Sequence, residues 1–510
     1  MTRPRATLTL AAAAVALASG CASFYLRRAP PSPGEGWRLP VATAAAGDTA
    51  ASAPQVVPGR VYTLPELIDL AESTHPDTRI AWERARQAAL GVGVAMAGYF
   101  PIVSALTLVG YQHTSFPAPH LSGSTVGINP FQLLPSVAFP VPRLAEPTGR
   151  IGVDTWQVLP FVNLRWELFH LGRAADVQVA RDLSTAANAL FTAEHERVVF
   201  EVARAFFRLN AARAQVAVSH DTLERTRAIA ASADARYARG LATAVETSEA
   251  RRELAQGEYN VAQAQAAEIA ARAGLVAAIG LDPKVPLEVA EDASVALPTR
   301  LARDVDAYIE AALAARPDLR AARARLPATE AGVWRSKTLY VPRVTLVGTA
   351  GGAWLGGRVD GHHLPTLSLP NVTVGLTFDW TLFDGGLREV QGSLARSQQA
   401  EAAQQLAKLE HQVVQEVVTA YNEANASLSR YQAATALLDA ADTAEAAATA
   451  SYTRGVATLT DAMTAEKMRA LASAAKAQAY ADALVAMTTL AFAAGELLSP
   501  QAVTARTPVR

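Results

Sequence analysis

The chain has 510 residues, which is enough for a large hydrophobic core and about two to four domains. Its formal net charge is −1, so the overall charge gives no indication of a nucleic-acid partner or a strongly acidic partner. Hydrophobic residues make up 50% of the chain but aromatic residues only 6%, and alanine supplies much of the difference. Because alanine has the highest helix propensity and lets helices approach closely, this composition is typical of long packed helices.

The first 20 residues have the pattern of a secretory signal peptide. A basic start is followed by the apolar run Leu8–Leu17, which is too short to span a bilayer, and then by small residues. Cys21 is the single cysteine, so an internal disulfide is excluded. Its position resembles the lipobox of bacterial lipoproteins, although Ala18 stands where leucine is usual. The resemblance implies that Cys21 is acylated and, since Ala22 follows it, that the protein is delivered to the outer membrane. The alternative is an ordinary secreted protein.

The remaining sequence contains two copies of one pattern. Four landmarks occur in the same order in both copies, which chance explains poorly. The paired landmarks are His75–Arg79 and Arg316–Arg320, Phe100–Pro101 and Val341–Pro342, Trp166–Gly172 and Trp380–Gly386, and Tyr237–Thr243 and Tyr452–Thr458. We predict a signal peptide at 1–20, Cys21 with a flexible Pro-, Ala- and Gly-rich tether to residue 61, repeats at 62–290 and 291–498, and a tail at 499–510. A gene duplication without functional meaning is the alternative.

Each repeat contains a block of about 110 residues without proline, 172–282 and 386–499. Because proline breaks helix interiors, each block allows very long helices. Gly240 and Gly455 lie inside the blocks, and each is followed closely by a threonine. This pattern predicts two antiparallel helices in each block, joined by a tight turn at the glycine.

An apolar seam on the first of these helices has coiled-coil spacing. Its residues lie alternately four and three apart: Phe191, His195, Val198, Val202, Ala205, Leu209, Ala212 and Val216. The seam predicts close packing against neighbouring helices. His195 interrupts it, and we interpret this residue as a satisfied interior histidine rather than a metal ligand.

Each repeat also carries two segments in which apolar and polar residues alternate. They are Ile102–Tyr111, where the alternation is weak, Val162–Leu168, Arg343–Ala350 and Val372–Phe383. Alternation of about ten residues, with aromatic residues near one end, favours transmembrane β-strands with a polar interior. A soluble half-buried sheet is the alternative. The segments 115–154 and 351–370 between paired strands are predicted to be loops.

Four strands cannot close a barrel that spans a bilayer. An open sheet edge in lipid leaves backbone groups unpaired, and outer-membrane barrels need about eight strands or more. The chain must therefore assemble with copies of itself. Three copies give twelve strands, a number that the sequence permits without requiring it.

These landmarks resemble those of TolC-like outer-membrane efflux proteins over residues 61–498, in particular the lipid-anchored branch that serves resistance-nodulation-division pumps. The resemblance implies a mostly α fold with a small β part. Each repeat holds a β-hairpin and a long antiparallel coiled-coil helix pair. Three chains form a transmembrane β-barrel that continues into a periplasmic α-barrel. It further implies a passive channel without enzymatic activity or cofactor, whose partners are a periplasmic adaptor, an inner-membrane pump and outer-membrane lipid.

The same resemblance assigns candidate functional residues. The two turns match the tips of the family's helical tube, which contact the adaptor: Gly240, Leu241 and Thr243, and Gly455, Val456 and Thr458. The family often has two acids after the second tip that narrow the closed pore. Asp461 matches the first, whereas Thr464 stands at the second position. Glu246 and Glu249 occupy the equivalent places after the first tip and share one helix face. In a trimer these acids would form rings of carboxylates, which favour cations. Solvated helix acids are the alternative.

Other chemistry finds little support. The sequence has no phosphate-binding Gly-Lys loop, no His-Glu-x-x-His motif and no paired cysteines. Loop histidines (His113, His120, His362 and His363) could bind a metal, but solvated histidines are the simpler interpretation. The rival functions are the duct of a type I protein secretion system, a periplasmic adaptor and a structural envelope lipoprotein. The substrate is not indicated.

Overall fold

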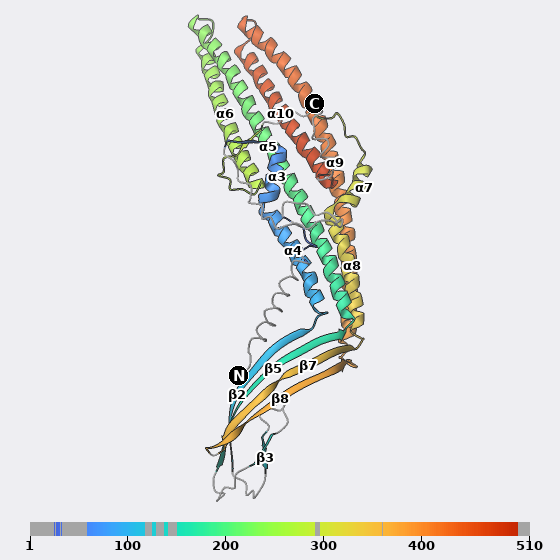
Figure 1. Ribbon diagram of the computed structural model, residues 1–510. Helices are drawn as coiled ribbons and strands as arrows, with labels where there is room; N and C mark the ends of the chain where they lie inside the picture. Colours follow the sequence, from blue (N-terminus) through green and yellow to red (C-terminus); the bar gives the residue numbers. More distant parts are fainter. Residues whose placement is uncertain are drawn as a thin grey trace. The chain divides into compact units, whose positions relative to one another are not determined.

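The computed structural model describes residues 59–117, 125–128, 137–140, 150–290, 296–359 and 361–497, together with Tyr25, residues 27–30 and Ser32 (Figure 1). The predicted signal peptide, Cys21 and the tail at 499–510 lie outside the described residues, as does most of the tether. The described start of the tether is held to helices: Trp82 donates to the Pro30 carbonyl at 2.8 Å, and Asn188 donates to the Arg28 carbonyl at 2.7 Å.

The helices and strands follow one another as two similar series. The first comprises β1 (Val61–Tyr62), α3 (Leu64–Thr74), α4 (Pro76–Ala97), β2 (Ile102–Pro117), β3 (Thr125–Ile128), β4 (Val137–Pro140), β5 (Arg150–Phe169), α5 (Gly172–Ala238), α6 (Ala244–Ala278) and β6 (Glu288–Val289). The second comprises α7 (Val305–Ala315), α8 (Pro317–Thr338), β7 (Arg343–Val359), β8 (His362–Asp379), α9 (Leu387–Thr453) and α10 (Leu459–Ala493).

Corresponding helices of the two series have equal lengths. α3 and α7 have 11 residues, α4 and α8 have 22, α5 and α9 have 67, and α6 and α10 have 35. A helix of 67 residues is about 100 Å long. The long helices and the two turns between them are therefore confirmed. Among the described residues, no helix combines the length and the apolar character needed to cross a membrane.

By its internal contacts the chain forms two compact units, which cut across the two series. One contains the described parts of residues 1–93, 178–331 and 396–510, and the other contains those of residues 94–177 and 332–395. The first is a helical unit and the second a sheet unit. The repeat boundaries at 62–290 and 291–498 stay a prediction.

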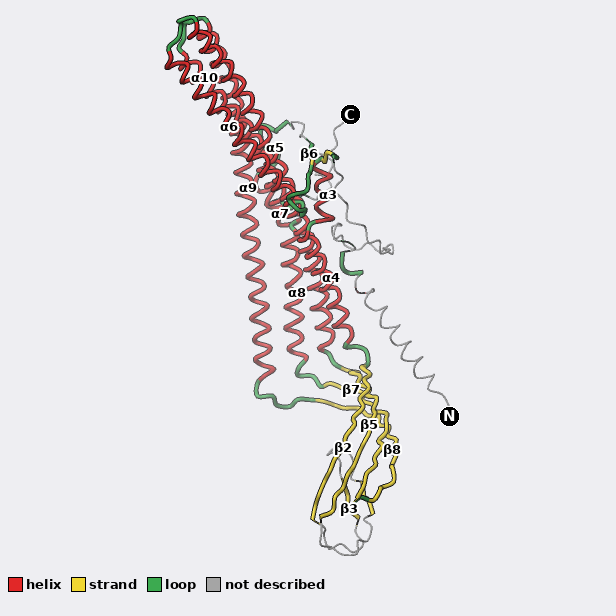
Figure 2. The backbone as a smooth tube through the Cα atoms, turned by 90° about the vertical axis from the view of Figure 1, so that its left-hand side faces the viewer, coloured by secondary structure: helices red, strands yellow, loops and turns green. Residues whose placement is uncertain are grey.

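The sheet unit is built on four long antiparallel strands in the order β2-β5-β7-β8 (Figure 2). The four predicted strands are therefore confirmed, but β8 ends at Asp379 rather than Phe383. The prediction of a loop at 351–370 is wrong, because β7 and β8 pair through most of it. The expected loop at 115–154 is also too long, since β2 extends to Pro117 and β5 begins at Arg150.

Glycines misled the loop prediction because they serve close packing between strands. A Cβ added at Gly351 would lie 2.2 Å from the Pro160 carbonyl oxygen, and one at Gly357 would lie 2.2 Å from that of Asp154. Both glycines are on β7 and face the neighbouring β5. Glycine within a strand often marks such a close backbone approach.

Two matching contacts connect strands to long helices in the sheet unit. In each contact, here called a clasp, an arginine side chain binds backbone carbonyls and stacks on a tyrosine ring. At the start of α5, Arg173 donates to the carbonyls of Gly98 and Glu167 at 3.0 and 2.6 Å and stacks on Tyr99. At the start of α9, Arg388 donates to the carbonyls of Thr381 and Leu382 and stacks on Tyr340.

The helical unit holds the main apolar cores. In one core Leu67 of α3, Leu209 of α5 and Leu275 of α6 are fully buried, and a parallel pair of short strands, β1 and β6, lies beside it. A second core contains Leu319, Val413 and Leu490. His195 is buried, meets the ring of Phe191 edge to face, and has its Nδ1 3.7 Å from a carboxylate oxygen of Glu72. It is thus an interior histidine with a partner.

Candidate functional site

One face of the four-stranded sheet is apolar and exposed. Residues directly opposite in an antiparallel pair point to the same side, so the register defines this face. It comprises Val103, Val109 and Tyr111 of β2, Trp156, Val162, Leu164 and Trp166 of β5, Leu346, Ala350 and Trp354 of β7, and Val372, Val374, Leu376 and Phe378 of β8. Most of these side chains are exposed to solvent in the single chain.

A tryptophan lies near each end of this apolar face along β5. Trp156 and Trp166 lie ten residues apart on the strand, which is about 33 Å at roughly 3.3 Å per residue. With a strand tilt of about 40°, the height between them is about 25 Å, the height of the apolar band of an outer-membrane barrel between its aromatic girdles. The face therefore has the dimensions of a lipid-facing surface.

The opposite face changes character along its length. Near Trp166 it carries polar residues: Asn163, Arg165, Glu167, Thr345, Thr349, Thr373 and Thr377. Farther along, Leu159, Ala353 and Leu355 form a small buried cluster with Phe161 and Leu367. The outer strands β2 and β8 pair on one side only within the described residues. These edges, 16 and 18 residues long, are unusually long to leave unpaired.

The structure places two of the loop histidines in one row across the sheet, His113, Asp154, Arg358 and His363. His113 contacts the Asp154 carboxylate at 2.7 Å. His363 lies three strand spacings from His113, about 14 Å, so these two histidines do not share a metal ion. His120 lies outside the described residues. Among the described residues, no three His, Cys, Asp or Glu side chains are grouped to hold a metal.

The two predicted tips are the α5–α6 turn and the α9–α10 turn. Gly240 has φ 73° and Gly455 has φ 79°, the left-handed conformation that glycine adopts without strain. The helices end in matching bonds: Leu241 N–H donates to the Arg236 carbonyl and Val456 N–H to the Ser451 carbonyl, each at 2.9 Å. Leu241 and Val456 are left exposed at the turns, as is Val245 beside the first.

The tips lie together through one packed cluster and one clasp. Ile229, Ala233 and Ala250 pack with Tyr452 and Leu459 across the two hairpins. The guanidinium of Arg236 donates to the Tyr452 carbonyl at 2.9 Å and lies over the Tyr452 ring. Tyr237 and Tyr452 occupy matching places in the two tips, but Tyr237 is 51% exposed and Tyr452 only 2% exposed. The matching sequences therefore gave no sign of this contact.

The predicted pore acids begin the second helix of each hairpin. The Asp461 carboxylate accepts from the backbone N–H and the hydroxyl of Thr458, at 2.9 and 2.6 Å, and these bonds lower its pKa. Asp461 is therefore a helix-capping residue. Glu246 donates its N–H to the Thr243 hydroxyl at 3.2 Å, and its charge helps burial to raise the pKa of Tyr452. Glu249 is half-buried one turn farther along.

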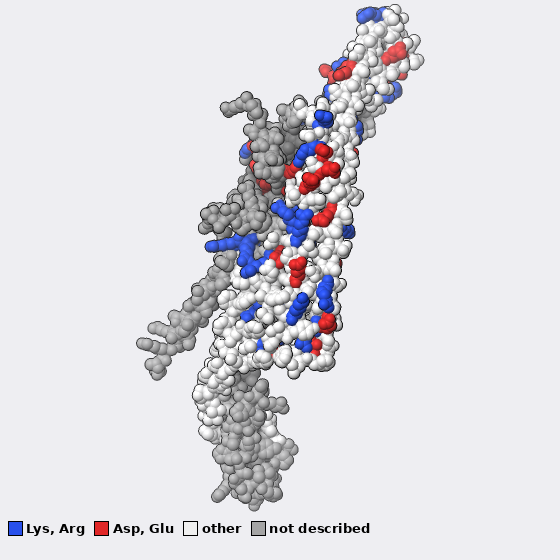
Figure 3. Space-filling model, turned by 90° about the vertical axis from the view of Figure 1, so that its right-hand side faces the viewer, with Lys and Arg blue, Asp and Glu red and all other residues white. Residues whose placement is uncertain are grey.

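A buried carboxylate in the helical unit was not anticipated. Glu466 of α10 is 3% exposed, and neither oxygen has a hydrogen-bond partner. Arg469 lies 3.8 Å from it but binds Asp221 at 2.7 Å and Asp442 at 2.8 Å instead. Burial raises the pKa of Glu466 to about 7. A single acid such as Glu466 does not stand out in a sequence with many charged residues. On the face shown in Figure 3, acidic and basic side chains are interspersed along the helices.

Comparisons with known proteins agree with these features. The family model described as outer membrane efflux protein matches residues 67–281 and 308–496. Protein CyaE of Bordetella pertussis is 27% identical over 352 residues, which are 68% of this chain and 65% of CyaE, just under two thirds of its length. The fusaric acid resistance protein FusA of Burkholderia cepacia is 27% identical over 412 residues, 76% of this chain and 69% of FusA.

A solved structure shows the same fold. The outer-membrane channel OprN superposes with a TM-score of 0.67 at 20% sequence identity, covering 91% of this chain and 99% of OprN. The family model covers most of the chain, including the helices and strands that form the tips and the sheet. The chain therefore belongs to the outer membrane efflux protein family.

Proposed function

We propose that the chain is the outer-membrane exit duct of a tripartite efflux system, a passive channel and not an enzyme. The apolar sheet face, about 25 Å high between its tryptophans, carries this proposal. Such a face is stable against lipid and costly in water, since the hydrophobic effect scales with the exposed apolar area. The family membership and the fold of OprN point the same way.

Three copies form the duct in this proposal. The free edges of β2 and β8 pair between neighbouring copies, so that twelve strands close into a barrel. Closure removes unpaired backbone N–H and C=O groups from the lipid, where each would cost several kcal/mol. The long helices α5, α6, α9 and α10 continue the duct into the periplasm.

The tips of the helical hairpins contact a periplasmic adaptor, which connects the duct to an inner-membrane pump. The exposed Leu241, Val245 and Val456 offer apolar anchor points on rigid, well-capped turns. Glu246, Glu249 and Asp461 narrow the pore near these tips. Cys21 carries the lipid anchor in the outer membrane.

A matched pair of charge substitutions tests the membrane assignment. Val372 points to the apolar face and Thr373, the next residue, to the polar face. Val372→Lys places a charge near the middle of the bilayer, where it costs about 2–4 kcal/mol, so the trimer in the outer-membrane fraction should be strongly reduced. Thr373→Lys should assemble normally. Equal recovery of both variants as trimers, or a parent chain that is monomeric and water-soluble without its first 21 residues, would refute the proposal.

Conductance tests the pore acids. In a planar bilayer, the purified trimer with Asp461→Ala and Glu246→Ala should conduct more and prefer cations less, because acids repel one another and attract cations in a narrow pore. Asp439→Ala, at an exposed acid of α9, is the control. Unchanged conductance and ion selectivity in the double variant would remove the constriction assignment.

Labelling with an alkyne fatty acid tests the lipid anchor, since Cys21→Ala should lose all label.

A further inference from the structure

The buried carboxylate of Glu466 lies where the two helical hairpins meet. The first hairpin is formed by α5 and α6, and the second by α9 and α10. Glu466 follows Ala462 by one turn of α10, and Ala462 belongs to the apolar cluster that packs the two tips together. The charged side chains around Glu466 come from three helices: Asp221 and Arg225 of α5, Asp442 and Glu445 of α9, and Arg469 of α10.

Among the described cations, Arg469 lies nearest to Glu466, but two other acids already share it. Its Nε lies 2.8 Å from a carboxylate oxygen of Asp442, and its Nη1 donates to Asp221 at 2.7 Å. The same Nη1 is 3.8 Å from Oε1 of Glu466, which is too far for a hydrogen bond. One nitrogen atom therefore stands between two carboxylates, one on its own helix and one on the other hairpin.

The remaining charged groups around Glu466 are paired with one another. The Nε of Arg225 lies 3.2 Å from Asp221, and its Nη1 lies 3.6 Å from Glu445. Glu445 also accepts from the Thr449 hydroxyl at 2.9 Å. Within the described part of the chain, both oxygens of Glu466 are left without a hydrogen-bond partner. Because an ionised carboxylate is costly in such a place, burial raises the pKa of Glu466 to about 7.

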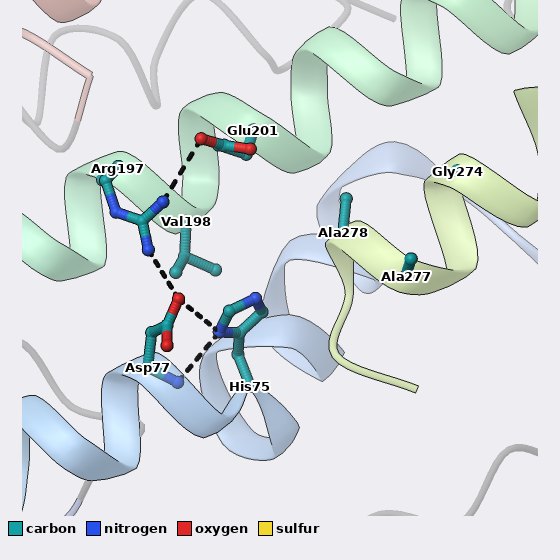
Figure 4. A pocket seen from close by; sticks show the side chains of 8 residues that line it. All are labelled: His75, Asp77, Arg197, Val198, Glu201, Gly274, Ala277 and Ala278. Atoms are coloured by element: carbon teal, nitrogen blue, oxygen red, sulfur yellow. Dashed lines mark hydrogen bonds and ion pairs between the residues drawn. The ribbon is translucent and has the colours of Figure 1, made fainter. Parts of the chain in front are cut away.

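Acids elsewhere in the helical unit do have a cationic partner. Asp77 and Glu201 line a cavity of about 330 Å³ beside His75, and Arg197 lies 2.7 Å from the first and 3.2 Å from the second (Figure 4). The absence of a partner at Glu466 is therefore not a general property of the acids in these helices.

We propose that Glu466 is a pH-sensitive switch in the connection between the two hairpins. With its proton, Glu466 leaves the Nη1 of Arg469 on Asp221, so that α10 is joined to α5. Without its proton, the Glu466 carboxylate attracts Nη1, while Nε stays on Asp442. A carboxylate accepts charge-assisted hydrogen bonds that a neutral carboxyl group does not offer. The ion pair between α10 and α5 is then lost, and the hairpins are held less firmly behind their tips.

The partners of the switch keep their charges over the pH range in which Glu466 titrates. Burial opposes it, but hydrogen bonds from Arg469 and Arg225 lower the pKa of Asp221, and arginine side chains stay protonated. The connection should therefore be firm below about pH 7 and should weaken as pH rises through that value. The inference goes beyond the exit-duct function and does not depend on it.

Hydrogen exchange of the full-length protein in non-ionic detergent tests the switch. Exchange is measured at about pH 5.5 and about pH 8.5, on either side of the Glu466 titration, and corrected for the intrinsic pH dependence of amide exchange. Protection of residues 218–228 of α5 should fall about tenfold at the higher pH, because a local opening becomes easier. Residues 180–190, near the other end of α5, are the internal control and should not change. Equal protection of residues 218–228 at both pH values would overturn the proposal.

Three variants separate the switch from a simpler effect of burial. Glu466→Gln stays neutral, so protection of residues 218–228 should remain high at both pH values. Asp221→Asn removes the acceptor on α5, so Arg469 turns to Glu466 at both pH values and protection should be low and independent of pH. Asp482→Asn, at an acid of α10 bonded to Gln478 of the same helix, should behave as the parent protein. A pH-dependent decline that persists in Glu466→Gln or in Asp221→Asn would refute the exchange of partners.

Discussion

The two halves of the chain neutralise a matching pair of acids with arginines from different positions. In both, an aspartate at the second position of a helix, Asp77 or Asp318, and a glutamate from a long helix, Glu201 or Glu416, share one guanidinium group. The second half supplies that group as Arg316, whose side chain is 10% exposed. The first half supplies it from α5 as Arg197, whose side chain is 40% exposed. The acids are fixed by position, whereas the cation is free to come from another element.

The sheet unit behaves differently, because there the halves agree in detail. Arg173 with Tyr99 and Arg388 with Tyr340 make the same clasp, and in each half a tryptophan donates to the carbonyl of that tyrosine, at 3.0 Å from Trp166 and 3.2 Å from Trp380. A strand that turns into a helix leaves carbonyls without partners, and a side chain with several fixed donors satisfies them. The residues that satisfy these backbone carbonyls are thus the same in both halves, whereas the arginine that balances the acids is not.

Removal of Arg316 or Arg197 should have clearly different effects on stability. Arg316→Ala leaves two carboxylates and a buried carbonyl without their partner, and we expect a loss of about 2–3 kcal/mol in the free energy of unfolding, since charged hydrogen bonds are removed. Arg197→Ala, in the more exposed cluster, should cost less than about 1 kcal/mol. Denaturant unfolding followed by circular dichroism measures both. Equal losses would show that burial does not distinguish the clusters.

The clasps predict equal effects instead. Arg173→Ala and Arg388→Ala each remove charged hydrogen bonds to carbonyl groups, and each should cost about 2 kcal/mol. Lysine at either position keeps the charge but not the forked donors, so it should restore only part of the loss. The measurement is the unfolding midpoint of the purified protein in detergent. A difference above about 1 kcal/mol between the two alanine variants would contradict their equivalence.

Glu466 should make the stability of the helical unit depend on pH. Its counterpart on α6 is Arg251, which is exposed. The pKa of Glu466 is about 7 in the folded chain and 4.5 ordinarily, so the folded state holds the proton more tightly. The free energy of unfolding should therefore fall as pH rises from about 4.5 to about 7. Glu466→Gln should flatten this decline in a pH series, and a decline that persists unchanged would exclude Glu466 as its source.

The tips provide the smallest predicted difference. Thr458 and Asp461 cap each other reciprocally, whereas Thr243 accepts a single backbone bond. Thr458→Ala should cost about 1 kcal/mol, and Thr243→Ala should cost less. Because the capping carboxylate of Asp461 has a lowered pKa, its contribution is present above the ordinary pKa of 3.8 and disappears as pH falls through the lower, folded value. Hydrogen exchange of the first turns of α6 and α10 measures both effects, and a larger loss at α6 would reverse the assignment.

The long helices, their turns at Gly240 and Gly455, and the four strands could all be predicted from the amino-acid sequence. Absence of proline, positive-φ glycines and alternating polarity act locally on the backbone, so they are legible without neighbours. The glycine-rich part of β7 was mistaken for a loop, because its glycines are needed for close contact with the adjacent strand β5. A contact of this kind leaves no local pattern in the sequence. The residues predicted for the tips lie at the two turns and the predicted pore acids near the starts of α6 and α10, while their roles at an adaptor and in a pore stay predictions. The capping role of Asp461 became evident only with its hydrogen bonds.

The pairing of charged side chains could be seen only in the folded chain. Arg197 lies 120 residues from Asp77, and Arg316 lies 100 residues from Glu416, so neither pairing has a sequence pattern of its own. Burial of Glu466, the clasp of Arg236 on Tyr452 and the cavity beside His75 depend likewise on helices brought together by packing. A side chain's partners are set by whatever surface lies opposite it, and that surface exists only once the helices have docked.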